Sequence, residues 1–201
     1  MRDFSRLDAF LDQRLDDIYP EPTGNVSEIV IEKMVPDIIS HYGIQTGAKV
    51  LDVGCGNGLA LQAFRLAGCD PIGIGFGKEA QMCRDEGFEI IEQDMSFLDF
   101  PEQKFDVVWC RHVLEHSIIP FFTLSEMFRI LKPGGVFYME VPSPGTSSKH
   151  ETNPNHYSVL TQEMWLSLIQ RIGYRVVRSN KFLFKTPVGE DAYFLFDSQK
   201  P

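Results

Sequence analysis

The hydrophobic pattern of this 201-residue chain changes character near residue 44. Before that point, apolar side chains recur at helical spacing in residues 3–18 and again in 26–42, which predicts two amphipathic helices. Beyond it, short apolar runs alternate with helical stretches. The predicted strands are 48–53, 70–74, 88–91, 105–110 and 135–141, the predicted helices are 58–67, 78–86, 120–131 and 161–172, and β-rich runs follow at 174–184 and 192–196. Strands separated by helices predict a parallel sheet with helices on both faces.

Proline, glycine and polar residues mark the connections between these elements. A proline-rich run at 19–24 ends the first helix, because proline cannot continue a helix interior, and Pro36 is expected to interrupt or kink the second. The polar loop at 142–155 is too long for a plain connection and is therefore a candidate lid. Residues 185–191, between the two β-rich runs, are predicted to form the loop of a hairpin.

The most informative segment is Val50-Leu51-Asp52-Val53-Gly54-Cys55-Gly56-Asn57-Gly58. An apolar strand that carries one acid runs into glycines at alternate positions, and a helical stretch follows. This order places a ligand at a helix N-terminus, where glycines let the backbone approach it closely. A dinucleotide-binding turn requires Gly-x-Gly-x-x-Gly, but here the third glycine comes one residue early and Leu59 fills the place that pattern needs.

The spacing Asp-x-Gly-x-Gly-x-Gly instead resembles the first motif of the class I S-adenosylmethionine-dependent methyltransferases. Three later segments, 105–110, 111–116 and 131–136, resemble that family's fourth strand, the turn after it and the turn before its fifth strand. The resemblance covers roughly residues 44–197 and is strongest to the small-molecule enzymes with a helical cap. It implies an α/β, Rossmann-like seven-stranded sheet, mostly parallel with the last strand antiparallel, with helices on both faces. Residues 1–43 would form the N-terminal helical cap, and 44–201 the core of a single domain.

Size, charge and cysteine content narrow the classes of partner. No apolar run approaches the ~20 residues of a membrane span, and the N-terminus lacks the apolar core of a signal peptide, so we expect no membrane partner. The cysteines (Cys55, Cys69, Cys83 and Cys110) contain no C-x-x-C pair and are expected to be reduced thiols of a cytoplasmic protein. A net charge of −9 without a Lys/Arg stripe argues against a nucleic-acid partner.

The resemblance implies S-adenosylmethionine as cofactor and S-adenosylhomocysteine as its product. Asp52 would orient the glycine loop or contact the ligand's amino group, although a cap on the following loop is an alternative. The other implied contacts are Gly54, Cys55 and Gly56 at the methionine part, Phe76 over the adenine face, Asp94 with Met95 at the adenine amino group, and Arg111 with His112 on the adenosine side. Asp99 is a second choice for the adenine contact, and a solvated loop acid is the alternative for Asp94.

The second predicted strand departs from the family pattern. The family ends this strand with an acid that accepts hydrogen bonds from both ribose hydroxyls, whereas here Gly75 occupies that place. Loss of the acceptor predicts cofactor binding that is weaker by about 1–3 kcal/mol. Glu79, one helical turn later, is a candidate substitute. Weak but real binding, an altered nucleotide and a lapsed enzyme are the explanations left open.

The segment His112-Val113-Leu114-Glu115-His116 also matches H-x-x-E-H, the signature of inverzincin zinc peptidases. In those proteins two histidines on one helix bind zinc, and the glutamate acts as general base. Here the pentapeptide directly follows a buried strand and precedes a proline at position 120, so it cannot lie inside a long helix. We therefore expect no metal site.

Methyl transfer from an activated sulfonium mainly requires alignment in a dry pocket, and a base only where the acceptor must lose a proton. His116 is a candidate base, with a loop-holding hydrogen bond as the alternative. His156 and Tyr157, at the end of the long loop, are candidates to bind or deprotonate an acceptor hydroxyl, or else to anchor the loop.

The sequence thus predicts methyl transfer from S-adenosylmethionine to a small-molecule acceptor. Two rival functions follow from particular residues. Gly75 favours a non-catalytic protein of methyltransferase fold that holds a nucleotide or serves as a partner subunit. A nicotinamide-dependent oxidoreductase on a similar sheet is the other rival, and both Leu59 and the missing ribose acid weigh against it.

Overall fold

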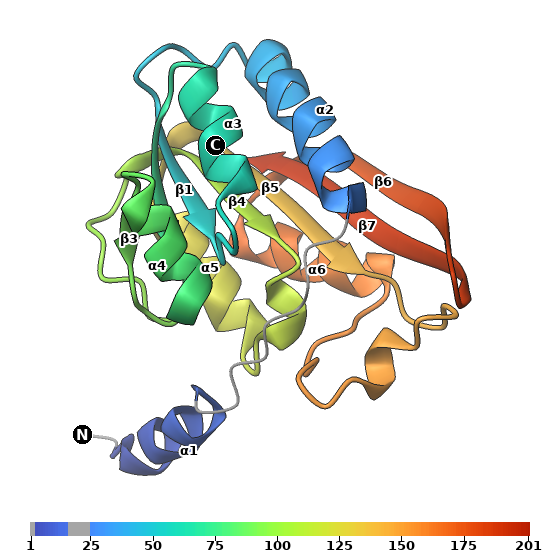
Figure 1. The fold of residues 1–201 in the computed structure, drawn as a ribbon. Helices are drawn as coiled ribbons and strands as arrows, with labels where there is room; N and C mark the ends of the chain where they lie inside the picture. Colours follow the sequence, from blue (N-terminus) through green and yellow to red (C-terminus); the bar gives the residue numbers. More distant parts are fainter. Residues whose placement is uncertain (1–2, 16–24) are drawn as a thin grey trace.

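The computed structural model describes residues 3–15 and 25–201, and its centre is a seven-stranded sheet (Figure 1). The strand order is β3-β2-β1-β4-β5-β7-β6. Strands β1 to β5 run parallel, and β7 lies antiparallel between β5 and β6. The strands are β1 (Lys49–Val53), β2 (Asp70–Ile74), β3 (Glu89–Ile91), β4 (Phe105–Arg111), β5 (Leu131–Pro142), β6 (Arg175–Thr186) and β7 (Gly189–Gln199). The predicted fold class is confirmed.

Helices cover both faces of the sheet (Figure 1). One layer contains α2 (Asn25–Tyr42), α3 (Leu59–Leu66) and α4 (Gly77–Asp85), and the other contains α5 (Pro120–Ile130) and α6 (Gln162–Ile172). The helix α1 (Ser5–Leu15) lies apart from both layers, on the side toward which the parallel strands point their carboxyl ends (Figure 1). Two short 3-10 helices, η1 (Leu114–His116) and η2 (His150–Thr152), follow β4 and β5.

Strand β4 shows why these sequences form a sheet that is buried on both faces. Val107 and Trp109 pack into the core on the α2–α3 side, whereas Val108 and Cys110 pack into the core on the α5–α6 side. Trp109 stacks on Tyr138 of β5 with ring centroids 3.8 Å apart. Each large apolar side chain buried in this way contributes roughly 1.5–3 kcal/mol. The strand whose carboxyl end carries the next loop is therefore held by packing on both faces.

Helix α2 belongs to the core layer. Its apolar residues recur at helical spacing and are buried against α3 and the sheet: Ile31, Met34, Val35 and Ile38. The helix continues through Pro36, which is exposed, so of the two expected effects the interruption is not observed, and a kink stays a prediction. On the solvent side, water can take the place of the one backbone hydrogen bond that proline removes. The division of the chain at residue 43 stays a prediction.

Most predicted boundaries hold to within one residue, including those of α3, α4 and α6. The hairpin loop predicted at 185–191 is wrong, since β6 continues to Thr186 and β7 begins at Gly189. Lys185 pairs with Glu190 and Thr186 with Gly189, which leaves a two-residue turn.

The predicted break at 19–24 lies outside the described residues. No helix within 3–15 or 25–201 combines the length and apolarity that a membrane crossing requires.

Candidate functional site

The loop after β1 needs glycine for steric reasons. Gly54 has a φ of +69°, in the left-handed region, and a Cβ there would lie 2.4 Å from Cγ2 of Val113. Gly56 has a φ of +48°. The loop then enters α3, whose N-terminal N–H groups lie at the carboxyl edge of the sheet. The turn therefore places backbone without side chains at the edge where an open α/β sheet binds its ligands.

Asp52 lies in the middle of the sheet, on β1 between β2 and β4. Its side chain is buried, and that burial raises its pKa to about 8, against the opposing charge of Arg111. A carboxyl group in this state is protonated at neutral pH. A positively charged ligand beside it would favour the ionised form and lower the pKa. The position therefore suits a cationic group.

The side chain of Cys55 lies next to Gly75, the position at the end of β2 where the family has its acid. The Cβ of any residue at Gly75 would lie 3.1 Å from the sulfur of Cys55, and one at Gly73 would lie 2.9 Å from it. Cys55 is buried, and burial raises the pKa of its thiol, so it is not a nucleophile. The side chain of Cys55 thus occupies the space that a side chain at Gly73 or Gly75 would need. Phe76 follows in extended conformation as the N-cap residue of α4.

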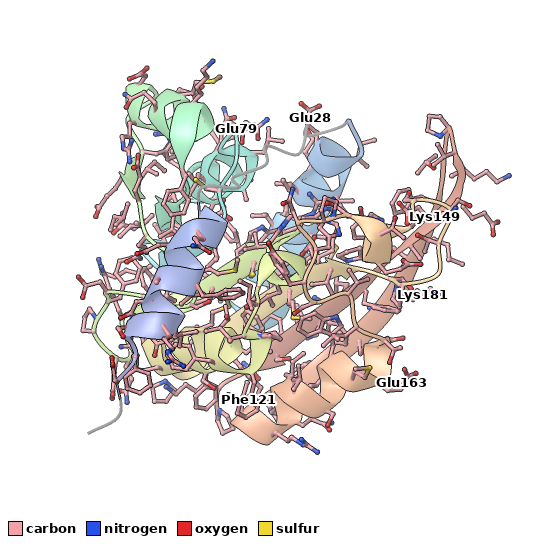
Figure 2. All side chains as sticks on the ribbon, turned by 90° about the horizontal axis from the view of Figure 1, so that it is seen from below. Glu28, Glu79, Phe121, Lys149, Glu163 and Lys181 are labelled. Carbon is pink, nitrogen blue, oxygen red and sulfur yellow. The ribbon has the colours of Figure 1, made fainter. Side chains whose placement is uncertain are left out.

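Glu79 faces the glycine turn. It lies in the first turn of α4, and its Oε2 is 3.6 Å from the position of a Cβ on Gly56. Figure 2, which views the molecule from the carboxyl edge of the parallel strands, labels Glu79 there. A carboxylate acceptor therefore stands beside the turn, although it comes from α4 rather than from the end of β2. The sequence pointed to this residue only as a candidate.

Asp94 and Met95 follow β3, as predicted, but their observed contacts are structural. Oδ1 of Asp94 accepts a hydrogen bond from the backbone N–H of Ser96 at 2.6 Å, so the acid caps its own loop. Met95 packs against the core on the α5–α6 side. Asp99 is exposed. An adenine contact by Asp94 stays a prediction, and it would use the same loop that this hydrogen bond holds.

Arg111 and His112 converge on Glu140 of β5. Nη2 of Arg111 and Nε2 of His112 each lie 3.0 Å from Oε1 of Glu140, and the hydroxyl of Tyr138 donates to Oε2 at 3.0 Å. Burial opposes ionisation of Glu140, but the hydrogen bonds and charges of His112 and Arg111 outweigh it and lower the pKa to about 2. His112 also stacks on Tyr193, with ring centroids 4.3 Å apart. Their predicted place on the adenosine side stays a prediction.

Replacing Glu140 with glutamine is expected to lower the free energy of unfolding by about 3 kcal/mol at pH 7, because Arg111 loses its buried counter-charge. A depressed pKa means that the ionised carboxylate stabilises the fold above its ordinary pKa of 4.5 and that this contribution is lost as the pH falls toward 2. The difference between wild type and E140Q should therefore narrow below pH 4.5. Urea unfolding at a series of pH values measures it.

The control is Glu92→Gln, the same substitution in the exposed pair with Arg84. An exposed pair contributes at most ~1 kcal/mol, so this variant should unfold nearly as wild type does. Equal losses in the two variants would contradict the buried-pair interpretation.

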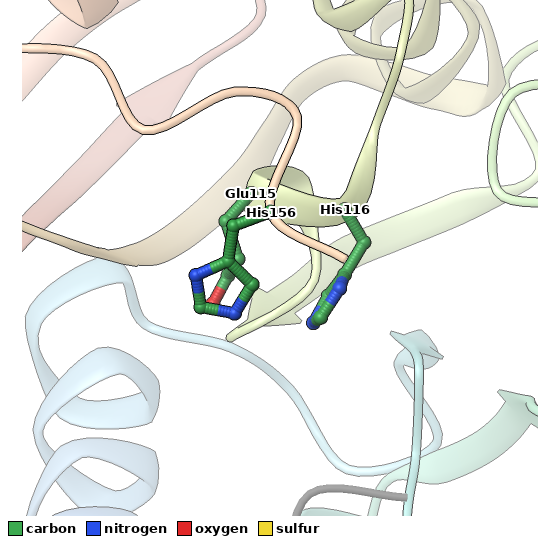
Figure 3. Close-up of side chains that lie close together, drawn as sticks. All are labelled: Glu115, His116 and His156. Atoms are coloured by element: carbon green, nitrogen blue, oxygen red, sulfur yellow. The ribbon is translucent and has the colours of Figure 1, made fainter. Parts of the chain in front are cut away.

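A cluster of His116, His156 and Glu115 lies at the next part of the carboxyl edge, and Figure 3 shows their side chains projecting into one space. His116 Nδ1 lies 2.9 Å from the carbonyl oxygen of Asn155, and His156 Nδ1 lies 3.1 Å from that of His150. A carbonyl only accepts, so Nδ1 is the donor in both rings, and in the neutral tautomer Nε2 is then the atom that can act as base or ligand. Tyr157 is 40% exposed. The structure thus brings together His116 and His156, two of the three residues that the sequence suggested for the acceptor side.

A family model described as a methyltransferase domain matches residues 28–179, which run from α2 into β6. The chain belongs to the methyltransferase domain family. Membership decides against the oxidoreductase and zinc-peptidase alternatives. The structure agrees on the second point, because residues 114–116 form a single 3-10 turn and His112 contacts Glu140 instead of the cluster around His116.

This methyltransferase domain resembles enzymes with different acceptors. It is 36% identical over 137 residues to a sterol 24-C-methyltransferase of Yarrowia lipolytica, covering 59% of this chain and 35% of that protein. It is 29% identical over 127 residues to a ubiquinone biosynthesis O-methyltransferase of Methylococcus capsulatus, covering 59% and 54%. A SAM-dependent methyltransferase structure from Archaeoglobus fulgidus shares the fold with a TM-score of 0.68 at 19% identity, covering 87% and 95%. The chain spans between a third and just over half of the two curated relatives.

Three residues of the methyltransferase domain's carboxyl edge escaped the sequence reasoning. His150, to which the sequence analysis gave no role, has its Nε2 3.2 Å from Asp191 of β7, and its ring stacks on His156. Asp191 also accepts from the hydroxyl of Ser148 at 2.6 Å. Glu115 completes the histidine cluster. The antiparallel pairing of β5 with β7, which local patterns do not contain, brings His150 to Asp191, whereas Glu115 belongs to the H-x-x-E-H segment and gave a signal only for a zinc peptidase.

Proposed function

We propose that this chain transfers a methyl group from S-adenosylmethionine to a small-molecule acceptor. The observation that carries the proposal is that a buried carboxyl group, Asp52, lies directly before the glycine turn at the end of β1. Glycine backbone can approach a ligand at Gly54 and Gly56, and a buried carboxyl with a pKa raised to about 8 lies on the same strand.

The residues present fit the cofactor. An amino-acid ammonium group beside Asp52 would compensate the cost of a buried carboxylate, and the turn at Gly54 and Gly56 offers N–H groups without side chains in the way. Phe76 and the loop of Asp94 follow the neighbouring strands β2 and β3, where the adenosine part would lie. When bound, the cofactor supplies a methyl group that is already activated by a sulfonium.

The acceptor side is formed by different elements. His116 comes from η1, and His156 and Tyr157 come from the loop after β5. The two relatives methylate a sterol carbon and act as an O-methyltransferase in ubiquinone biosynthesis, as their names state. Both kinds of transfer release a proton from the acceptor, and an imidazole with its lone pair on Nε2 can take it. We assign His116 and His156 to that role, and Tyr157 to contact with the acceptor.

Calorimetric titration of the chain with S-adenosylmethionine and S-adenosylhomocysteine, with NAD as control, tests the proposal. Micromolar binding of the adenosyl ligands without binding of NAD supports it, and label from a methyl-labelled cofactor should then appear in a small-molecule acceptor. The absence of heat and of a thermal shift up to millimolar ligand would reject it and favour the non-catalytic partner role.

Replacing Glu79 with glutamine is expected to weaken S-adenosylhomocysteine binding by about tenfold, because the ribose hydroxyls lose a charged acceptor. The reason is the position of Oε2 of Glu79 beside Gly56 and the glycine that stands where the family has its acid. Calorimetry measures the change. The control is Glu86→Gln at the other end of α4, where the side chain is exposed and binding should be unchanged.

An acid restored at the family position provides the reciprocal test. Gly75→Asp places a Cβ 3.1 Å from the sulfur of Cys55, a tight contact that a small shift of this side chain relieves. In the E79Q background it should recover the lost affinity. Unchanged binding in E79Q, or no recovery on adding G75D, would show that Glu79 does not replace the ribose acceptor.

A further inference from the structure

We propose that His116, His156 and Glu115 form a binding site for a divalent first-row transition-metal ion, of the kind that Zn²⁺ and Fe²⁺ occupy. Each residue offers one ligand atom, and these atoms all lie within 4.8 Å of one another. Two imidazoles and one carboxylate are the ligand set of many catalytic zinc and non-haem iron sites. Nothing in the methyltransferase motifs requires such an ion.

The distances approach those of a loaded site. A tetrahedral metal with Zn–N and Zn–O bonds of about 2.0–2.2 Å holds its ligand atoms roughly 3.4 Å apart. The ligand atoms here lie within 4.8 Å of one another, so the most distant pair would approach by at most about 1.4 Å on binding. The rings of His116 and His156 have centroids 4.9 Å apart and stand nearly perpendicular, at 83°. In Figure 3 both rings turn toward the space that Glu115 also enters.

The hydrogen bonds of the two histidines match those of metal ligands. A ligating imidazole almost always donates its second N–H to a carbonyl or carboxylate, which fixes the tautomer and the ring orientation. His116 does so to Asn155 at 2.9 Å, and His156 does so to His150 at 3.1 Å. In that tautomer Nε2 is the atom that each ring would use for the metal. In a chain loaded with the ion, neither Nε2 would be left to accept the acceptor's proton, which would pass to water instead.

The two chain segments that provide the ligands are fixed to each other. The backbone N–H of Ser158 donates to the carbonyl of Glu115 at 2.9 Å, and its hydroxyl donates to the carbonyl of Ser117 at 2.6 Å. Ser158 is buried, as are Glu115 and His156. His156 is therefore held beside the Glu115–His116 pair before any ligand arrives. Such preorganisation reduces the cost of assembling a site.

Three protein ligands leave open coordination positions, which is typical of catalytic rather than structural metal sites. The half-buried side chain of His116 puts the opening on the acceptor side of the carboxyl edge. An oxygen or nitrogen atom of the acceptor is the group that would fill it. This last step rests on the proposed function, whereas metal binding itself does not.

Titration of the chelator-treated chain with Co²⁺ tests the proposal, because Co²⁺ bound by histidine and carboxylate absorbs visible light. We expect one ion per chain with micromolar or tighter affinity, competed by Zn²⁺. His116→Ala and His156→Ala should each lower the affinity at least 100-fold, and Glu115→Gln at least tenfold. His41→Ala, at the exposed end of α2, is the matched control and should bind as wild type does.

Wild type without a saturable Co²⁺ spectrum overturns the proposal, and so do H116A and H156A variants that bind Co²⁺ as tightly as wild type. Circular dichroism in the presence of chelator confirms that the variants fold. H116Q and H156Q, which keep a donor near the carbonyls, replace any alanine variant that does not. Calorimetry with S-adenosylhomocysteine in chelator separates the two proposals: cofactor binding without Co²⁺ binding refutes only the metal site, and the reverse result refutes only the proposed function.

Discussion

Alanine in place of Gly54 is expected to destabilise the fold by about 4 kcal/mol, from left-handed backbone strain and overpacking together. The new Cβ would lie 2.4 Å from Cγ2 of Val113, and the φ of +69° disfavours any side chain. Val113 is β-branched and has few rotamers with which to escape. The turn would have to move, so S-adenosylhomocysteine binding should fall at least 100-fold. Urea unfolding and calorimetry measure the two effects.

Gly43 is the matched control for this substitution. It has a similar φ of +63°, but no atom lies within 4 Å of the position that a Cβ would take, so Gly43→Ala retains the strain without the clash. Its cost should be about 1–2 kcal/mol, with cofactor binding unchanged. Val113→Ala in the G54A background removes the clashing methyl group and should recover part of the stability. The same loss in G43A and G54A would mean that contact with Val113 is unimportant.

Asp52→Asn is expected to stabilise the fold by up to about 5 kcal/mol at pH 8.5, since it removes a charge that is costly to bury. The folded pKa is raised from the ordinary 3.8 to about 8, so folding takes up a proton. Wild type should therefore lose stability as the pH rises from 4 to 8, and the difference from D52N should grow over that range. Arg111 keeps Glu140 as a partner in the variant. Thermal and urea unfolding across this range measure the difference.

The substitution Asp52→Asn, which should stabilise the fold, should weaken binding of the cofactor. If an ammonium group lies against Asp52, binding ionises the carboxyl, and up to one proton is released at pH 7. Calorimetry in buffers of different ionisation enthalpy counts that proton between pH 6 and about 6.5, below the range in which the ligand's own amino group, with a pKa of roughly 7.7–8.0, titrates. D52N should release fewer protons and bind about 10- to 100-fold more weakly. Identical proton release in both proteins would place the cation elsewhere.

The parts of the fold that follow local patterns were predictable. A run such as Val50–Val53 that enters alternating glycines has few conformations other than strand and turn, and helix α3 follows from its apolar spacing. The hairpin was not predictable in detail. Lys185, Thr186 and Pro187 have the composition of a loop, yet the first two continue an exposed ladder in which polar side chains remain solvated.

The candidate site likewise contains residues that local sequence identifies and residues that it does not. Asp52 and the glycine turn are contiguous in sequence, so one motif identified them. Glu79 beside Gly56 and His156 beside His116 are brought together only by the packing of separate elements. The link from His150 to Asp191 joins residues 41 positions apart through the pairing of β5 with β7. A single sequence contains no local signal for such contacts.

The order of the strands has a consequence for how this domain can diversify. The proposed cofactor residues lie on or follow β1, β2 and β3: Asp52, Phe76 and Asp94. The proposed acceptor residues follow β4 and β5, beside the hairpin of β6 and β7. The loop after β5 is held to that hairpin by Ser147, whose backbone N–H donates to the carbonyl of Glu190 at 3.0 Å, and by the pair of His150 with Asp191. Changes in this loop and in the glycine turn share few partners, so their effects should add. Evolution can then alter the choice of acceptor at the carboxyl-terminal hairpin while the glycine turn and its neighbouring strands stay as they are.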